Sequence, residues 1–147
     1  MRSNDRIWCY SILAGLAVLV LCWGYFVFSG NNVLTVQKSW LEDPWGQANT
    51  VFRTGHKVTV HRDYCLKKDA DVTFSTMLMQ SGVNVPIPKV SGILHLDAGC
   101  GQFQYSFYLD GLPEGDYQFD STLSYKSDAL GGTRDLELPA LRLRITE

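Results

Sequence analysis

Two alternating segments in the C-terminal half of the chain constrain the fold more than any other feature of the sequence. In residues 102–109, aromatic and aliphatic side chains alternate with polar ones, and residues 117–125 repeat the pattern after the turn-forming segment 111–116, GLPEGD. A period of two places successive side chains on opposite faces of a β-strand. The two segments therefore predict two strands joined by a turn, each with one apolar face that other β-structure must cover.

Weaker alternation occurs in five further segments. No part of residues 31–147 carries an extended apolar stripe at helical spacing, which disfavours β–α–β units and favours packed antiparallel sheets. The fold class predicted for this region is all-β, an antiparallel β-sandwich of about seven strands. The further strands are predicted at 32–38, 57–63, 72–80, 90–96 and 141–145.

The N-terminal region is of a different kind. Residues 7–28 contain no charged side chain and no proline. As a helix, this segment covers about 33 Å, against about 30 Å for the hydrocarbon core of a bilayer. Trp8 and Trp23 lie near its two ends, where aromatic residues meet membrane interfaces. The segment predicts one N-terminal transmembrane α-helix, with a cleaved signal peptide as the alternative.

The distribution of basic residues sets the expected topology. Arg2 and Arg6 precede the apolar segment, whereas Lys38 is the first basic residue after it. The positive-inside rule predicts a single-pass signal-anchor protein of the inner (cytoplasmic) membrane, with its C-terminal domain in the periplasm or outside the cell. Ser11 and Gly15 offer a small-residue contact for a homo-oligomer through the helix. The expected organisation is a cytoplasmic N-terminus at 1–6, a transmembrane helix at 7–28, a juxtamembrane linker and first strand at 29–50, and the β-sandwich domain at 51–147.

The four cysteines divide into two groups. Cys9 and Cys22 lie in the apolar helix, about 20 Å apart along its axis, which is too far for a disulfide. Cys65 ends one predicted strand and Cys100 precedes another, on the side assigned to an oxidising compartment. We predict a Cys65–Cys100 disulfide, with two reduced thiols as the alternative. In the chain-entropy model such a bond stabilises the domain by about 3 to 4 kcal/mol.

The segment Gly111-Leu112-Pro113-Glu114-Gly115-Asp116-Tyr117 resembles the turn that leads into the penultimate strand of immunoglobulin-like and fibronectin-III-like domains. The resemblance implies an Ig-like β-sandwich in which Tyr117 is the corner tyrosine, its hydroxyl bonded to nearby backbone. The chain lacks the cysteine and tryptophan spacing of antibody domains. The resemblance therefore implies a fold class and no function.

Two histidine–carboxylate pairs suggest a metal site. His61 and Asp63 are two residues apart, as are His95 and Asp97, so each pair lies on one face of its predicted strand. Together they offer four nitrogen or oxygen ligands, with His56 in reserve. The alternative is that these side chains are the ordinary polar residues of an outward-facing sheet surface.

Other chemistry finds no support in the sequence. There is no phosphate-binding glycine loop before a helix, no nucleophile elbow, no Cys-x-x-Cys and no His-Glu-x-x-His. The 13 basic and 15 acidic residues leave a formal charge of −2, which disfavours nucleic-acid binding. We expect a non-enzymatic protein without a cofactor.

Protein interaction is the remaining function that the sequence favours. Trp40 and Trp45 lie in a non-periodic stretch where two indoles could anchor a partner, although core packing is the alternative. Turn-rich connections with Pro86 and Pro88, and with Arg134, are further candidates. The predicted function is a membrane-anchored Ig-like domain that contacts a protein partner in the envelope, within an envelope or a phage- or plasmid-encoded assembly. A membrane-tethered domain for a metal or a small ligand is the alternative.

Overall fold

The computed structural model describes residues 3–30, 32–83, 86–127 and 131–147, which form one helix and nine strands. The strands follow the alternation of the sequence, and apolar side chains of each strand point to a common interior. In chain order the elements are α1 (Ser3–Gly30), β1 (Thr35–Glu42), β2 (Val51–Arg53), β3 (Lys57–Leu66), β4 (Ala70–Gln80), β5 (Pro86–Leu96), β6 (Gly99–Tyr108), β7 (Gly115–Lys126), β8 (Thr133–Glu137) and β9 (Leu141–Thr146).

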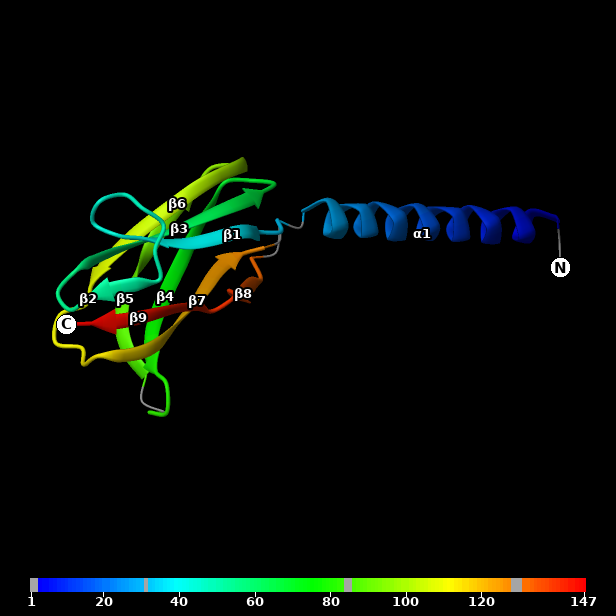
Figure 1. Ribbon diagram of the computed structural model, residues 1–147. Helices are drawn as coiled ribbons and strands as arrows, with labels where there is room; N and C mark the ends of the chain where they lie inside the picture. The colour runs from blue at the N-terminus through cyan, green and yellow to red at the C-terminus, as the bar shows by residue number, and fades with distance from the viewer. Residues whose placement is uncertain (1–2, 31, 84–85, 128–130) are drawn as a thin grey trace.

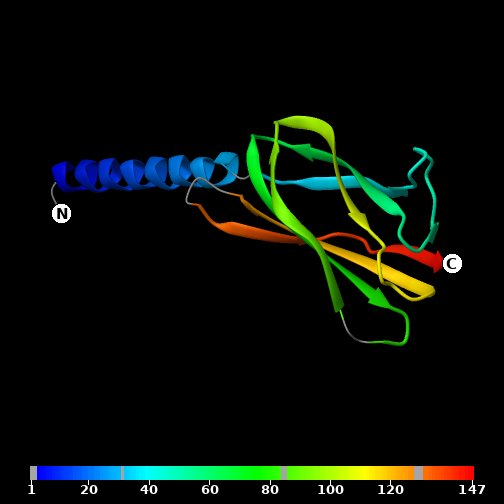
Figure 2. The ribbon, with the colours of Figure 1, turned by 90° about the vertical axis from the view of Figure 1, so that its left-hand side faces the viewer.

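The strands form two facing sheets (Figure 1). One has the order β1-β3-β6 and the other the order β2-β9-β7-β4-β5, with β8 also paired to β7. Both sheets are twisted and curled (Figure 2). The mostly-β architecture agrees with the predicted fold class. The strand set is larger than expected, because β2 and β8 were not predicted, and the β2–β9 pair is parallel.

Aromatic side chains join the two sheets. Phe107 of β6 stacks on Phe119 of β7, with ring centroids 4.9 Å apart, and Tyr105 of β6 stacks on Phe74 of β4 at 4.8 Å. All four side chains are buried. The alternation in 102–109 and 117–125 therefore supplies the inner faces of two different sheets, which pack against each other.

The disulfide lies within the three-stranded sheet. Cys65 of β3 and Cys100 of β6 are directly opposite in the ladder, and a bond joins their sulfur atoms. The Cα atoms are 4.0 Å apart. The bond therefore links neighbouring strands of one sheet, at the end of the domain where β3 turns into β4.

Tyr117 is held at the other end of the domain. Its ring is buried, and its hydroxyl donates a 2.8 Å hydrogen bond to the carbonyl oxygen of Pro113 in the preceding turn. Burial raises the pKa of the phenol. Gln118, the next residue, is exposed on the opposite face, as the period of two requires.

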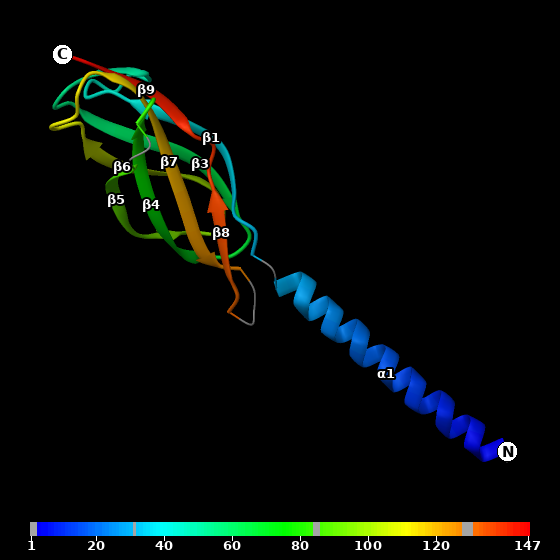
Figure 3. The same cartoon turned by 90° about the horizontal axis from the view of Figure 1, so that it is seen from below.

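Helix α1 projects away from the sheets (Figure 3). Asn32 fixes the chain that follows it: its amide donates to the carbonyl oxygen of Lys68 at 2.7 Å, and its side-chain oxygen accepts from the backbone amides of Lys67 and Lys68. The backbone amide of Leu34 donates to the Tyr125 hydroxyl at 3.0 Å. These bonds attach the first strand to both sheets, so the two-sheet domain begins well before residue 51.

In the described part of the chain, no helix combines the length and the apolar character that a membrane crossing requires. The finding contradicts the predicted transmembrane helix at 7–28. It also overturns the predictions that depended on it: the signal anchor, the single-pass inner-membrane and periplasmic location, the membrane as a partner, and the homo-oligomer through Ser11 and Gly15.

The disulfide predicts a measurable loss of stability. Cys65→Ser should lower the free energy of unfolding by about 3 to 4 kcal/mol, because the unfolded chain regains the freedom of the loop between residues 65 and 100. Urea melts of the full chain measure the change. Cys22→Ser is the control, since Cys22 is a free, exposed cysteine of α1. Equal unfolding midpoints for the two variants would show that the bond does not contribute.

The corner hydrogen bond is tested by a neighbouring pair of substitutions. Tyr117→Phe removes only the hydroxyl and leaves its polar partner without a donor, so it should cost about 1 to 3 kcal/mol. Gln118→Ala on the exposed face should stay within about 0.5 kcal/mol. A larger loss at Gln118 than at Tyr117 would contradict the assignment of faces in β7.

Candidate functional site

The outer face of the three-stranded sheet carries a packed cluster around His61. The Trp40 ring stacks on the His61 ring, with centroids 5.1 Å apart and planes 6° from parallel, and Lys38 Nζ lies 5.0 Å from the Trp40 ring centroid. His61 Nε2 is 3.0 Å from Glu42 Oε2, without the geometry of a hydrogen bond, and Nδ1 is 3.3 Å from Gln102 Oε1. These neighbours leave His61 only 7% exposed. His61 therefore packs within the sheet surface.

The predicted metal ligands are not brought together. His61 and Asp63 lie on β3, whereas His95 lies on β5 of the other sheet, with Asp97 directly after it. Asp63 accepts from Gln102 Nε2 at 3.1 Å, and the reserve ligand His56 contacts Trp45 edge-on. In residues that the structure describes, no group of three or more His, Cys, Asp or Glu could hold a metal ion. The four-residue site fails because its two halves belong to different sheets.

The predicted interaction residues are also spread over the domain. Trp45 is 73% exposed in the loop after β1, which the Asp43 carboxylate holds by accepting from the Trp45 and Gln47 backbone amides. The Gln47 bond is the main cause of a lowered Asp43 pKa. Pro86 and Pro88 lie in the edge strand β5, and Arg134 lies in β8. Trp40 lines a groove that is described below, and Trp45 follows in the next loop. Pro86, Pro88 and Arg134 do not line that groove.

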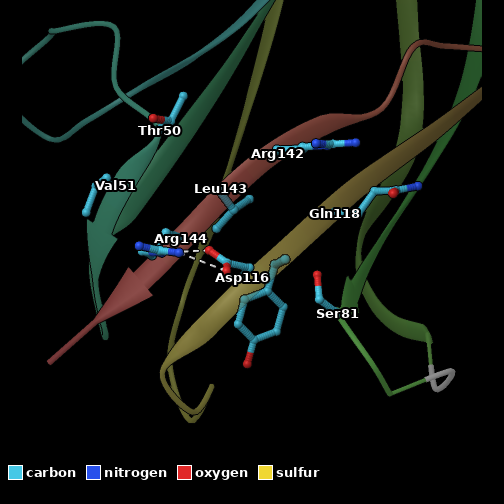
Figure 4. Close-up of a pocket in the computed structure, with 9 residues that line it drawn as sticks. Thr50, Val51, Ser81, Asp116, Gln118, Arg142, Leu143 and Arg144 are labelled. Atoms are coloured by element: carbon cyan, nitrogen blue, oxygen red, sulfur yellow. Dashed lines mark hydrogen bonds and ion pairs between the residues drawn. The ribbon is translucent and has the colours of Figure 1, made fainter.

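An open groove of about 640 Å³ lies beside strand β9 (Figure 4). The Asp116 carboxylate accepts from Arg144 Nε at 2.6 Å and from Nη2 at 2.9 Å. This pair lowers the pKa of Asp116 and raises that of Arg144. Arg142 stands apart from the pair, as Figure 4 shows. We call this the β9 groove; it is lined by Thr50, Val51, Ser81, Asp116, Tyr117, Gln118, Arg142, Leu143 and Arg144.

A second groove, of about 460 Å³, lies on the other side of β9, where the edges of the two sheets meet. Thr50 and Arg142 line both grooves, so the two adjoin at β9, and together we call them the depression around β9. The Arg142 side chain is exposed, and its guanidinium has no hydrogen bond or ion pair to any other described residue. We call this the β1–β9 groove; it is lined by Ser39, Trp40, Leu41, Ala48, Asn49, Thr50, Ala140, Leu141 and Arg142.

A buried arginine lies behind the β1–β9 groove. Arg62 of β3 points inward between the sheets and is completely buried. Its Nη1 donates to Ser39 Oγ at 2.8 Å and its Nη2 to Ser121 Oγ at 2.9 Å, while Nε has no hydrogen-bond partner. In the described residues no carboxylate pairs with this guanidinium. Ser39, which lines the groove, therefore separates a buried positive charge from the groove interior.

The sequence interpretation did not single out Ser39, Arg62 or Arg142. The signal for Arg62 was present, because it continues the inward positions of Val58 and Val60 in an alternating strand. A charged side chain at such a position is rare in cores. Arg142 lies in the predicted last strand, 141–145, but only the structure shows that Asp116 pairs with Arg144 and not with Arg142.

The comparisons with known proteins place the fold and nothing beyond it. No protein-family model matches the chain, and no curated protein matches it. The solved structures that are similar include the C-terminal domain of wzt, at 13% identity and a TM-score of 0.60, covering 80% of this chain and 76% of that one. A putative ApaA protein from Bordetella pertussis matches at 12% identity and a TM-score of 0.51, over 79% of this chain and 96% of that one. A Niemann-Pick type C2 protein from the Japanese carpenter ant matches at 10% identity and a TM-score of 0.50, over 80% and 96%.

His95 gives a pH prediction outside the grooves. A hydrogen bond between His95 Nδ1 and Asp71 Oδ1, 2.8 Å long, is the main cause of a His95 pKa raised above its ordinary value. Because the pKa is raised on folding, the pair contributes its full stabilisation below the unfolded pKa and loses it as pH rises through the folded pKa. NMR titration of the full chain should show Asp71→Asn lowering the His95 pKa. An unchanged pKa in Asp71→Asn, compared with Asp63→Asn as the control, would contradict the pairing.

Proposed function

We propose that this chain is a non-enzymatic binding module, an immunoglobulin-like β-sandwich that docks a segment of another protein in the depression around β9. The two facing sheets and the corner bond from Tyr117 to Pro113 support the Ig-like assignment. The disulfide within one sheet departs from antibody domains, whose disulfide joins the two sheets. The assignment is therefore to the wider class of Ig-like sandwiches.

The observation that carries the proposal is the position of Arg142. It lines both grooves, is exposed, and has no partner in the described part of the chain. Trp40 also lines the β1–β9 groove, and arginine and tryptophan are among the residues that most often dominate binding energy at protein interfaces. An exposed cation beside a tryptophan residue at one open depression matches a peptide segment of a partner.

The chemistry of the grooves favours binding over catalysis. Asp116 is held ionised by Arg144, which lowers its pKa, so it is a poor proton donor at neutral pH. The other charged groups in the two grooves are arginines, which do not exchange protons in this range. The unpaired Arg142 guanidinium can hold a negatively charged group, and the polar side chains of the lining can form hydrogen bonds with a bound segment.

A matched pair of charge reversals tests the proposal. Arg142→Glu and Arg134→Glu make the same change on exposed positions of two strands in the same sheet. With the full chain as bait, we expect Arg142→Glu and Trp40→Ala to reduce recovery of a captured protein by about tenfold or more, equivalent to about 1.4 kcal/mol. Arg134→Glu should recover it as the original chain does. A captured protein that is lost equally with both reversals, or with neither, would contradict docking around β9.

A further inference from the structure

The buried guanidinium of Arg62 is the most unusual charge in the molecule. Arginine stays protonated in proteins, and removing an unpaired charge from water is costly unless other groups compensate. Arg62 is fully buried, yet its compensation consists of two hydroxyl oxygens, and Nε has no partner. An anion close to this position would supply the missing opposite charge.

The hydrogen bonds around Arg62 lead to the groove. Ser39 Oγ accepts from Arg62 Nη1, so the Ser39 hydroxyl hydrogen remains for a different acceptor. Ser121, the other partner, already shares a hydrogen bond of 3.1 Å with the Tyr105 hydroxyl inside the core. Ser39 lines the β1–β9 groove, and Ser121 does not. The Ser39 hydroxyl is therefore a donor at the groove wall, polarised by a positive charge directly behind it.

Arg142 adds a second positive group to the same groove. It lines the groove with Ser39 and has no described acidic neighbour in contact. Of the acidic residues nearby, Glu42 is directed to His61 on the outer face of the sheet, and Asp116 is paired with Arg144. The exposed Arg142 guanidinium therefore lies in the groove wall and the buried Arg62 guanidinium lies behind Ser39, so both add positive potential at the groove.

We infer that the β1–β9 groove binds a side-chain carboxylate from an acidic segment of the partner, between the Ser39 hydroxyl and the Arg142 guanidinium. The inference rests on the proposed function and specifies its chemistry. The carboxylate accepts from Ser39 Oγ and from Arg142, and its charge compensates Arg62 through Ser39. The β1–β9 groove shares Thr50 and Arg142 with the adjoining β9 groove, so an extended segment that reaches both fits better than an isolated small anion.

The experiment uses poly-L-glutamate as the probe and the full ¹⁵N-labelled chain, kept monodisperse with a mild detergent because α1 exposes large apolar side chains. The Arg62 Nε–H resonance reports on the buried charge directly. We expect saturable shifts of this resonance and of the Ser39 amide, absent with poly-L-lysine. Ser39→Ala and Arg142→Gln should each weaken binding by about tenfold, in line with the loss of one hydrogen bond to a charged group. Ser39→Thr should bind poly-L-glutamate as the unsubstituted chain does, because threonine keeps the hydroxyl.

The control is Arg134→Gln, which removes the same charge outside both grooves and should leave the affinity within about twofold. Since Ser39→Ala also removes a partner of Arg62, its fold is checked by the dispersion of its amide resonances. If Ser39→Ala does not fold, the affinities of Ser39→Thr and Arg142→Gln for poly-L-glutamate decide whether the carboxylate site exists. An Arg62 resonance that does not move, or equal losses in Arg142→Gln and Arg134→Gln, would overturn the carboxylate site. Docking around β9 would then still be decided separately, by recovery of the captured protein with Arg142→Glu and Arg134→Glu.

Discussion

The packing of β6 against β7 is the interaction on which the rest of the structure depends. Each strand alternates apolar and polar side chains, and the stacked rings of Phe107 and Phe119 belong to different sheets. Because each sheet has an apolar face that must leave water, the two faces cover each other and fix the separation of the layers. Every other inward side chain is then confined to this interior, where a polar group needs a partner within reach.

The inward polar residues differ in how completely their hydrogen-bonding groups are paired. Thr76, at the β4 bulge, donates to the Val90 carbonyl oxygen at 2.7 Å and accepts from the Val90 amide at 2.9 Å, so its hydroxyl replaces ladder hydrogen bonds lost at the irregularity. Arg62 is larger and charged, and it spans the two sheets between Ser39 and Ser121. Thr76 is explained by the local structure alone. The local structure does not explain Arg62 in this way. Its guanidinium is incompletely paired, and its partner Ser39 lines the β1–β9 groove.

The sequence predicts what depends on neighbours along the chain. Alternation located β6 and β7 and assigned Tyr117 to the inner face, and the structure contains both the corner bond and the Cys65–Cys100 bond. Strand β2 has only three residues and forms by pairing with β9, so no local pattern reveals it. The metal hypothesis failed for a related reason. A period of two shows that His61 and Asp63 share a face, but it does not show which sheet His95 joins.

The charge of the groove depends on the register of β7 against β9. Arg144 lies opposite Asp116 in the ladder, whereas Arg142 lies opposite Gln118. Opposite charges at facing positions pair across the strands, and a neutral amide at the next such position cannot neutralise an arginine. The Gln118 amide instead donates to Asp120 at 2.9 Å. One neutral side chain therefore separates an arginine whose charge is used within the fold from an arginine whose charge is available to a ligand. Because β7 is held in register by the corner bond and by its packing on β6, the position of that free charge is fixed by the core of the domain.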